Sequence, residues 1–348
     1  MIAAYRQRGV HAALGAALLF GAGTPFAKLL LEGASPWLLA GLLYLGSGVG
    51  LFAYRRIRRA RPISMTQPDR AWLAAAIVAG GVVGPALLML GLSGMPASGA
   101  SLLLNAEGVF TALLAWFAFR ENFDRRIVLG MLLIVAGAIV LSWPGEADFG
   151  VTLPALAVLG ACLAWALDNN FTRKVALNDA TFIAMTKGLI AGATNIALAM
   201  AVGASLPPGG IVAGAAVVGL LSYGVSLAFF VVALRELGTA RTGAYFSTAP
   251  FAGGLIAIVL LGEPVTWQLV AAGALMAGGV WLHLTERHAH RHAHSPATHD
   301  HVHVHDEHHR HSHQGGEPTG EPHAHLHAHA ALTHEHPHYP DSHHRHSH

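Results

Sequence analysis

Residues 71 to 92 read AWLAAAIVAGGVVGPALLMLGL, a run of 22 residues without a charged side chain. A helix needs about 20 mostly apolar residues to cross the hydrocarbon core of a bilayer, where no water satisfies backbone polar groups. Nine further runs meet or approach this length. We therefore predict an all-α integral membrane protein with ten transmembrane helices, at residues 10–31, 36–54, 71–92, 96–118, 127–143, 152–169, 181–203, 211–234, 242–261 and 265–284.

The composition excludes a soluble globular protein. Hydrophobic residues make up 53% of the 348 residues and charged residues only 11%, against roughly a quarter charged in soluble domains. The first apolar run is longer than that of a typical signal peptide and lacks a convincing A-x-A cleavage site, so we expect a retained helix. The single cysteine, Cys162, excludes an intramolecular disulfide framework and a cysteine-based zinc site.

Positive residues occupy alternate loops between the predicted spans. One set of loops carries 15 Lys and Arg residues and the other set carries none. Because positive loops resist translocation, we expect the first set in the cytoplasm, together with the N-terminus. An even number of spans returns the C-terminal tail to the same side. The 15 residues are Arg6, Arg8, Arg55, Arg56, Arg58, Arg59, Arg61, Arg70, Arg120, Arg125, Arg126, Arg173, Lys174, Arg235 and Arg241.

The two halves of the chain contain similar segments. Residues 15–20 read GAALLF and residues 160–165 read GACLAW, while FRE at 119–121 and LGE at 261–263 are each followed by a glycine-rich run. Each half holds five predicted helices, and an odd number makes the second half enter the membrane from the opposite side. Inverted repeats of this kind are frequent in secondary transporters, which bind substrate near the midplane between the halves. Helices rich in Gly, Ala and Leu also resemble one another by composition alone.

With Glu121, Glu263 and the glycines that follow them, the chain resembles EamA-type members of the drug/metabolite transporter superfamily over about residues 10 to 284. The resemblance implies two five-helix repeats, at 1–145 and 146–285, followed by a tail at 286–348. It also implies export or exchange of small metabolites across a bacterial cytoplasmic membrane by alternating access, without ATP. The fourth and ninth helices of such proteins often carry a central proline. Pro250 supplies it in the second repeat, but the first repeat has Asn105-Ala106-Glu107-Gly108 instead.

Few polar side chains fall at predicted membrane depth, where each is costly unless it is paired or hydrated. Glu107 lies near the middle of the fourth span beside Asn105, and Lys187 lies in the seventh span, two turns before Asn195. We predict that Glu107 couples transport to protons, because a carboxylate in a low-dielectric cavity can take up and release a proton. Two alternatives stay open: an ion pair between Glu107 and Lys187, or a Glu107 that faces a water-filled vestibule.

Several residues of the eighth and ninth spans are candidates for lining a transport cavity. A proline there frees backbone carbonyls that could bind substrate or simply kink the helix. Trp165 and Tyr245 could stack on a ligand, although packing is the commoner role of a lone aromatic residue. The candidates are Tyr223, Ser247, Thr248 and Pro250.

Other polar residues lie at the predicted ends of spans. Asp168, Asn169 and Asn170 end the sixth span, so we prefer helix capping and loop contacts for them over a role as a substrate gate. Glu121 and Glu263 fall in short hairpins, where we expect each to cap a helix N-terminus.

The C-terminal segment has a different chemistry. Of the 25 histidines, 23 lie between His288 and His348, with almost no large apolar side chains among them, so we expect this tail to be disordered without a ligand. In an extended chain residues i and i+2 share a side, and the repeated His-x-His pattern therefore offers several imidazoles to one Zn, Ni, Co or Cu ion. The predicted ligands are His288, His290, His292, His294, His301, His303, His305, His311, His313, His323, His325, His327, His329, His334, His336, His338, His343, His344, His346 and His348.

Three roles for the tail stay open. It could regulate transport by binding metal, or it could be a tolerated low-complexity segment without a function. It could also sense pH, because histidine has a reference pKa of about 6.5 and the charged tail would be attracted to anionic lipid.

We therefore predict a secondary transporter that exports a small metabolite or drug-like solute by alternating access, coupled to protons, with a metal-binding regulatory tail. The alternative is an exporter of divalent Ni, Co or Zn ions or their complexes that uses the tail to collect the ion. The membrane part has no P-loop, His-Glu-x-x-His or convincing Ser-His-Asp set, so we expect neither an enzyme nor a required cofactor. The expected partners are a small-molecule solute and the lipid bilayer, with a homodimer as an open alternative and no nucleic acid.

Overall fold

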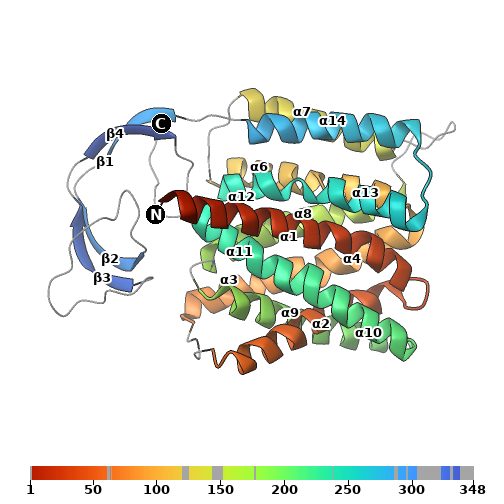
Figure 1. Ribbon diagram of the computed structural model, residues 1–348. Coiled ribbons are helices and arrows are strands. Elements are labelled where there is room, and N and C mark those ends of the chain that lie inside the picture. Colours follow the sequence, from red (N-terminus) through yellow and green to blue (C-terminus); the bar gives the residue numbers. More distant parts are fainter. Residues whose placement is uncertain are drawn as a thin grey trace. The chain divides into compact units, whose positions relative to one another are not determined.

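The structure, a computed structural model, describes residues 2–60, 63, 65–119, 125–142, 152–175, 178–237, 239–285, 289–294, 297–303, 323–329 and 332–337. Contacts within the chain separate a helical unit, which includes Met1–Glu286, from a second unit at Arg287–Pro340. The helical unit is a bundle whose helices lie side by side along roughly one direction, from left to right in Figure 1. In chain order its elements are α1 (Ile2–Leu30), α2 (Pro36–Ile57), α3 (Gln67–Ala76), η1 (Ile77–Val83), α4 (Gly84–Gly94), α5 (Ala97–Leu103), α6 (Ala106–Phe119), α7 (Arg125–Ser142), α8 (Leu153–Val175), α9 (Ala180–Ala201), α10 (Gly209–Val218), η2 (Gly219–Val225), α11 (Ser226–Leu237), α12 (Thr239–Phe246), α13 (Ala249–Leu261) and α14 (Trp267–Leu284).

Each of the ten predicted spans coincides with one helix or with a run of consecutive helices, which confirms the all-α membrane fold for the described residues of the helical unit. Large apolar side chains remain exposed on this unit, among them Leu255 at 64% and Val259 at 77%. A surface of this kind suits contact with lipid, which is as apolar as the side chains themselves. Five helical runs are long and apolar enough to cross a membrane: Arg8–Leu30, Pro36–Ile57, Gln67–Gly94, Ala180–Ala201 and Gly209–Leu234. Shorter apolar helices cover Val128–Leu141, Ala249–Leu261 and Trp267–Leu282.

The third helix of each half contains a π-helical segment at an equivalent position. η1 separates α3 from α4, and η2 separates α10 from α11. The two segments begin 142 residues apart, at 77 and 219, which is also the distance from Glu121 to Glu263 in the sequence repeat. Short π segments inside α-helices are rare and frequently mark functional sites. The sequence alone gave no sign of either one.

The fourth helix of each half is broken near its middle. The second half breaks at Ser247 and Thr248, just before Pro250 at the start of α13. The first half has no proline there, yet it breaks at Leu104 and Asn105. The Asn105 amide donates to the carbonyl oxygen of Leu102 at 3.0 Å, a local bond of the kind by which Asn competes with regular helix. The first repeat therefore lacks the central proline but keeps the break in its fourth helix.

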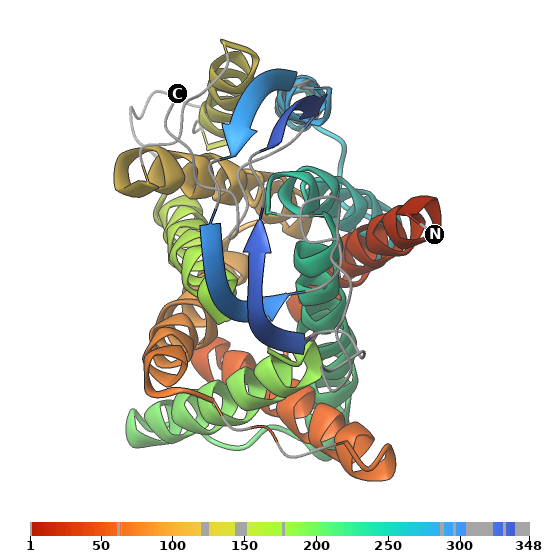
Figure 2. The ribbon, with the colours of Figure 1, turned by 90° about the vertical axis from the view of Figure 1, so that its left-hand side faces the viewer.

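Glycines let several helices approach closely. A Cβ at Gly48 of α2 would lie 2.3 Å from the backbone nitrogen of Leu189 in α9, so α2 and α9 pack backbone against backbone at this point. Helices α7 and α14 form another close pair along one edge of the bundle (Figures 1 and 2). There a Cβ at Gly279 would come within 2.5 Å of the carbonyl oxygen of Gly130.

Glu263 caps a helix of the other half, as predicted. Its two carboxylate oxygens accept hydrogen bonds from the backbone N–H groups of Ala97 at 2.7 Å and Ser98 at 2.9 Å, at the start of α5. A carboxylate at a helix N-terminus is favoured by the helix dipole. Glu121 lies outside the described residues.

The second unit contains four short strands in the histidine-rich tail: β1 (Ala289–His294), β2 (Ala297–His303), β3 (His323–His329) and β4 (Leu332–Pro337). β1 pairs with β4 and β2 pairs with β3, both antiparallel. The alternating His-x-His pattern has the period of a strand. An isolated two-stranded ribbon is marginally stable at best in water, so disorder of the tail without a ligand stays a prediction.

Candidate functional site

A cavity lies inside the helical unit. It contains about 480 Å³ of space free of atoms, which includes the solvent space at its opening. Helices of both halves contribute to it: α1, α2 and α6 from the first, and α8, α9, η2, α11 and α12 from the second. The lining residues are Phe20, Tyr44, Glu107, Trp165, Asp168, Asn169, Lys187, Ser222, Tyr223, Ser226, Leu227, Phe230 and Phe246.

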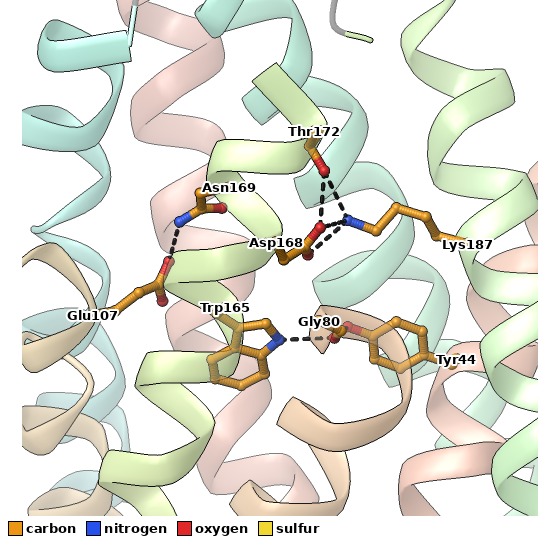
Figure 3. A network of polar contacts seen from close by, with 8 residues as sticks. All are labelled: Tyr44, Gly80, Glu107, Trp165, Asp168, Asn169, Thr172 and Lys187. Carbon is orange, nitrogen blue, oxygen red and sulfur yellow. Dashed lines mark hydrogen bonds and ion pairs between the residues drawn. The ribbon is translucent and has the colours of Figure 1, made fainter. Parts of the chain in front are cut away.

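Asp168 and Lys187 form a buried ion pair at this cavity (Figure 3). The ammonium nitrogen of Lys187 lies 2.6 Å and 2.7 Å from the two carboxylate oxygens of Asp168, and it also contacts Thr172 Oγ1 at 3.2 Å. Thr172 donates its hydroxyl to Asp168 at 2.8 Å. With 1% of Lys187 and 6% of Asp168 exposed, the two charges neutralise each other inside the bundle.

This pair corrects two expectations from the sequence. The alternative pairing of Lys187 with Glu107 is wrong, because Asp168 is the carboxylate beside the ammonium group. The capping role preferred for Asp168 is also wrong, because α8 continues to Val175 instead of ending near residue 169. Arg173 and Lys174 suit the last turn of a helix, where the dipole favours positive charge, so they extend α8 rather than end it.

The ion pair fits against η1 because residue 80 is a glycine. A Cβ at Gly80 would lie 2.0 Å from a carboxylate oxygen of Asp168. The carbonyl oxygen of Gly80 accepts two side-chain hydrogen bonds, from Tyr44 Oη at 2.8 Å and from Trp165 Nε1 at 2.9 Å (Figure 3). The π segment thus connects the ion pair with two aromatic residues of the cavity wall.

Glu107 is the second acidic group of the cavity. It lies in the first turn of α6, where the helix dipole favours a negative charge. The amide nitrogen of Asn169 donates to its Oε1 at 2.6 Å, from α8 across to α6 (Figure 3). Among the residues that the structure describes, Glu107 has no ion-pair partner.

Six aromatic rings line the cavity and contact one another. The ring of Phe20 lies 5.6 Å from that of Trp165, 6.0 Å from that of Tyr223 and 5.3 Å from that of Phe246. Tyr44 and Tyr223 are 5.2 Å apart, and Phe230 and Phe246 are 4.8 Å apart. These distances are typical of aromatic pairs. The cavity therefore combines an apolar aromatic wall with a few charged groups.

The cavity reflects the internal repeat. Phe20 and Trp165 end the matching segments GAALLF and GACLAW, and their rings are in contact in the cavity wall. Asp168 of the second half fits against Gly80 of η1, and conversely Gly23 of the first half fits against Ser222 of η2, where a Cβ would lie 2.7 Å from the serine side chain. The first helix of each half thus packs on the π segment of the other.

Of the residues singled out from the sequence, Glu107, Lys187 and Tyr223 line the cavity, and Trp165 does so as well. Asn195 joins two helices instead: it accepts from Trp37 Nε1 at 3.0 Å and donates to the Gly81 carbonyl oxygen at 2.9 Å. The hydroxyl groups of Ser247 and Thr248 donate to backbone oxygens of their own helix, and Pro250 is buried. The described residues that line the cavity do not include Asn105, Asn195, Ser247, Thr248 or Pro250.

Sequence reasoning missed most of the aromatic wall. The sequence did indicate Phe20, because the internal repeat aligns it with Trp165. Tyr44 and Ser222 are polar residues inside apolar runs. The charges of Glu107 and Lys187 inside such runs were a strong indication of a site, and an uncharged polar residue is a weaker one. Phe230 and Phe246 cannot be distinguished by sequence from other apolar residues that face lipid or core.

The predicted metal ligands lie in the tail. Eleven of them fall in the described strands, and His288, His305, His311, His313, His338, His343, His344, His346 and His348 lie outside the described residues. Where the structure describes side chains, it contains no group of three or more His, Cys, Asp or Glu residues placed to hold a metal ion.

Comparison with known proteins identifies one matching family and several similar proteins. The model of the EamA-like transporter family matches residues 7–143 and again residues 152–285, within the repeats that we predict at 1–145 and 146–285. An uncharacterized transporter of Methanothermobacter thermautotrophicus is 27% identical over 301 residues, which cover 80% of this chain and 87% of that one. A probable amino-acid metabolite efflux pump of Salmonella typhimurium is 26% identical over 208 residues, or 55% of this chain and 68% of that one.

Two further similarities cover different shares of the chain. The ArnE subunit of a probable 4-amino-4-deoxy-L-arabinose-phosphoundecaprenol flippase from Pseudomonas fluorescens is 36% identical over 106 residues, which cover 30% of this chain and 91% of the subunit. A solved crystal structure matches with a TM-score of 0.61 and 18% identity, over 80% of this chain and 98% of that one. At this identity the likeness to the crystal structure shows a shared fold.

Proposed function

Because the chain belongs to the EamA-like transporter family, whose model matches both of its halves, we propose that it moves its small solute by alternating access through the cavity described above. It is a multi-pass membrane protein of a transporter family. The observation that carries the proposal is a cavity between the two halves that contains buried charged groups. Buried charges in a membrane bundle usually mark a substrate or ion pathway. Transport rather than catalysis is the activity we assign.

The symmetry of the bundle supports alternating access. Both third helices carry a π segment and both fourth helices are broken near the middle. Discontinuous helices at the interface of inverted repeats are typical of transporters that rock one half against the other around a central site.

We propose export from the cytoplasm across the bacterial inner membrane, with both termini in the cytoplasm. The distribution of 15 positive residues in one set of loops and none in the other supports this orientation. The name of the Salmonella relative, a probable amino-acid metabolite efflux pump, is consistent with the outward direction. A homodimer stays a prediction.

Glu107 is our candidate for proton coupling. It lines the cavity and its carboxylate is held by a neutral amide rather than by a cation. A carboxylate in such a place can bind either a proton or a solute in alternate steps of the cycle. The other titratable groups around the cavity are Tyr44, Asp168, Lys187, Tyr223 and the thiol of Cys162, which contacts the Leu103 carbonyl oxygen.

The experiment is a transport assay in proteoliposomes that enclose a pH-sensitive dye. Radiolabelled amines, amino acids, purines and neutral solutes are added outside as a panel, and both solute uptake and solute-driven proton flux are recorded. We expect flux with at least one class of solute, loss of that flux in Glu107→Gln, and unchanged flux in the control Glu32→Gln, whose side chain is exposed in a loop. Solute flux without any proton movement would remove the coupling role, and the absence of flux for the whole panel would refute the transport proposal.

We also propose that the tail binds divalent Zn, Ni, Co or Cu and regulates transport. The register of the ribbons supports this: it sets His301 opposite His325 and His292 opposite His334. Opposite residues in an antiparallel pair share one face, with Cβ atoms about 4.5–5.5 Å apart, and imidazole is a preferred ligand of these metals.

The tail is tested by calorimetric titration with Ni²⁺ and Zn²⁺. Full-length protein should bind several ions, and a chain that ends at Glu286 should bind none. Replacing His301 and His325 by alanine should weaken binding more than replacing His343 and His344, which lie outside the described residues. Equal effects would contradict the paired arrangement. Metal efflux from loaded vesicles would favour the alternative of metal export.

A further inference from the structure

We propose that the solute of this cavity carries one positively charged amine beside an apolar or aromatic body, and that the amine binds the carboxylate of Glu107. This inference rests on the proposed transport function and adds the chemical class of the substrate. Its evidence is the charge balance of the cavity, the geometry around Glu107 and the aromatic wall.

The charge balance leaves one carboxylate for a ligand. Lys187 contacts both oxygens of Asp168 and the hydroxyl oxygen of Thr172, so the three donors of its ammonium group are occupied. Asp168 and Lys187 together contribute no net charge to the cavity. Glu107 is then the carboxylate of the cavity lining that lacks a cationic partner among the described residues.

The geometry around Glu107 offers acceptors to an ammonium group. Asn169 donates to Oε1 of Glu107, and each carboxylate oxygen has two lone pairs, so Oε2 and part of Oε1 can still accept. Figure 3 shows the two side chains extending toward each other from α6 and α8. An amine with two or three N–H groups matches this arrangement.

The aromatic wall suits the rest of such a solute. The rings of Phe20, Trp165, Tyr223 and Phe246 line the same cavity as Glu107. Aromatic faces attract cations and bury apolar bodies. An anionic solute would meet the charge of Glu107 and a lysine whose donors are already used, so we expect anions to be rejected.

Three probes with the same phenyl body and different charge test the inference on the purified full-length protein. These are 2-phenylethylamine, 2-phenylethanol and 3-phenylpropionate, with binding measured by calorimetry in detergent. We expect the amine to bind about tenfold or more tightly than the other two, because a charge-assisted hydrogen bond replaces a neutral one or a repulsion. Glu107→Gln should remove this preference, and Glu32→Gln should preserve it. Equal or tighter binding of the alcohol or the acid overturns the proposal.

A second measurement applies if Glu107→Gln does not fold. 2-Phenylethylamine, like the side chain of lysine, stays protonated between about pH 5 and 8, so on the wild-type protein its affinity should fall as the pH is lowered and protons occupy Glu107. The affinity for 2-phenylethanol should stay constant. An affinity of the amine that does not change with pH overturns the inference. Flux of purines or neutral solutes in the vesicle assay without amine binding would refute the amine class alone, and amine binding without flux would refute the transport proposal alone.

Discussion

At the scale of single residues, the buried pair of Asp168 and Lys187 gives the clearest prediction. Removing one partner leaves an uncompensated charge in the bundle, which costs about 3–5 kcal/mol. Lys187→Met and Asp168→Asn should each lower the thermal unfolding temperature strongly. The double variant should recover most of the loss, because no buried charge then remains unpaired.

Thermal unfolding in detergent measures both effects. The control is Arg58→Gln, which removes an exposed positive charge and should change stability by less than about 1 kcal/mol. Single variants as stable as the wild type would mean that water or lipid headgroups reach the pair, contrary to its burial.

A second prediction concerns Asp179, which lies just before α9, outside the membrane-spanning segment, and caps that helix. Partial burial by itself raises the pKa of this carboxyl, but hydrogen bonds from Thr181, the Phe182 N–H and Arg55 outweigh it and hold the pKa below 3.8. The capped state is therefore stabilised above the pKa of the unfolded chain, and this contribution disappears as the pH falls through the lower folded-state value. The unfolding temperatures of wild type and Asp179→Asn should differ at pH 7 and converge in strong acid. A constant difference would contradict the titration.

At the scale of elements, the contact of α2 with α9 depends on the missing side chain of Gly48. Gly48→Ala would place a methyl group 2.3 Å from a backbone nitrogen, and overpacking of this kind costs about 1–3 kcal/mol. Gly210→Ala is the matched control, because a Cβ there meets nothing within 4 Å. We expect a lower unfolding temperature for the first variant only. An unaffected Gly48→Ala would show that the two helices can separate at no cost.

The elements also show what the sequence could predict. Apart from the start of α1, at Ile2 instead of residue 10, and the end of α8, the apolar runs located the helix ends to within about four residues, because a membrane permits few other structures for such segments. The end of α8 was missed because charged residues look like a loop, although they also suit the end of a helix. The break at Asn105 and the π segments depend on local hydrogen bonds and on packing against the other half, which no single run of residues encodes.

The candidate site was predictable in part for the same reason. Glu107 and Lys187 were recognisable as charges within apolar runs. Their partners were not, because the choice between Asp168 and Glu107 for Lys187 depends on which faces of α6, α8 and α9 meet. The aromatic wall consists of residue types that are common throughout the bundle. Only Phe20 was indicated by the internal repeat.

At the scale of the whole molecule, the orientation in the membrane is testable with the native cysteine in place, because Cys162 is completely buried. Ser93→Cys lies exposed in the last turn of α4, on the predicted outer side, and Arg58→Cys lies exposed just after α2, on the predicted cytoplasmic side. In intact cells a membrane-impermeant maleimide should label Ser93→Cys and not Arg58→Cys. After permeabilisation it should label both. The reverse pattern would place the termini outside the cytoplasm.

The paired π segments have a consequence at the level of the gene. A π turn accommodates one residue more than the α-helical pattern, so η1 and η2 each amount to a one-codon insertion at matching positions of the two halves. Deleting the codon of Gly81 would remove the extra residue and let the third helix continue as a regular α-helix, with the residues beyond it on the same faces as before. Leu88 and Leu92, which are completely buried, would keep their places, but the first half would lose the wide turn that the second half retains, and the two halves of the protein would no longer be copies of one shape.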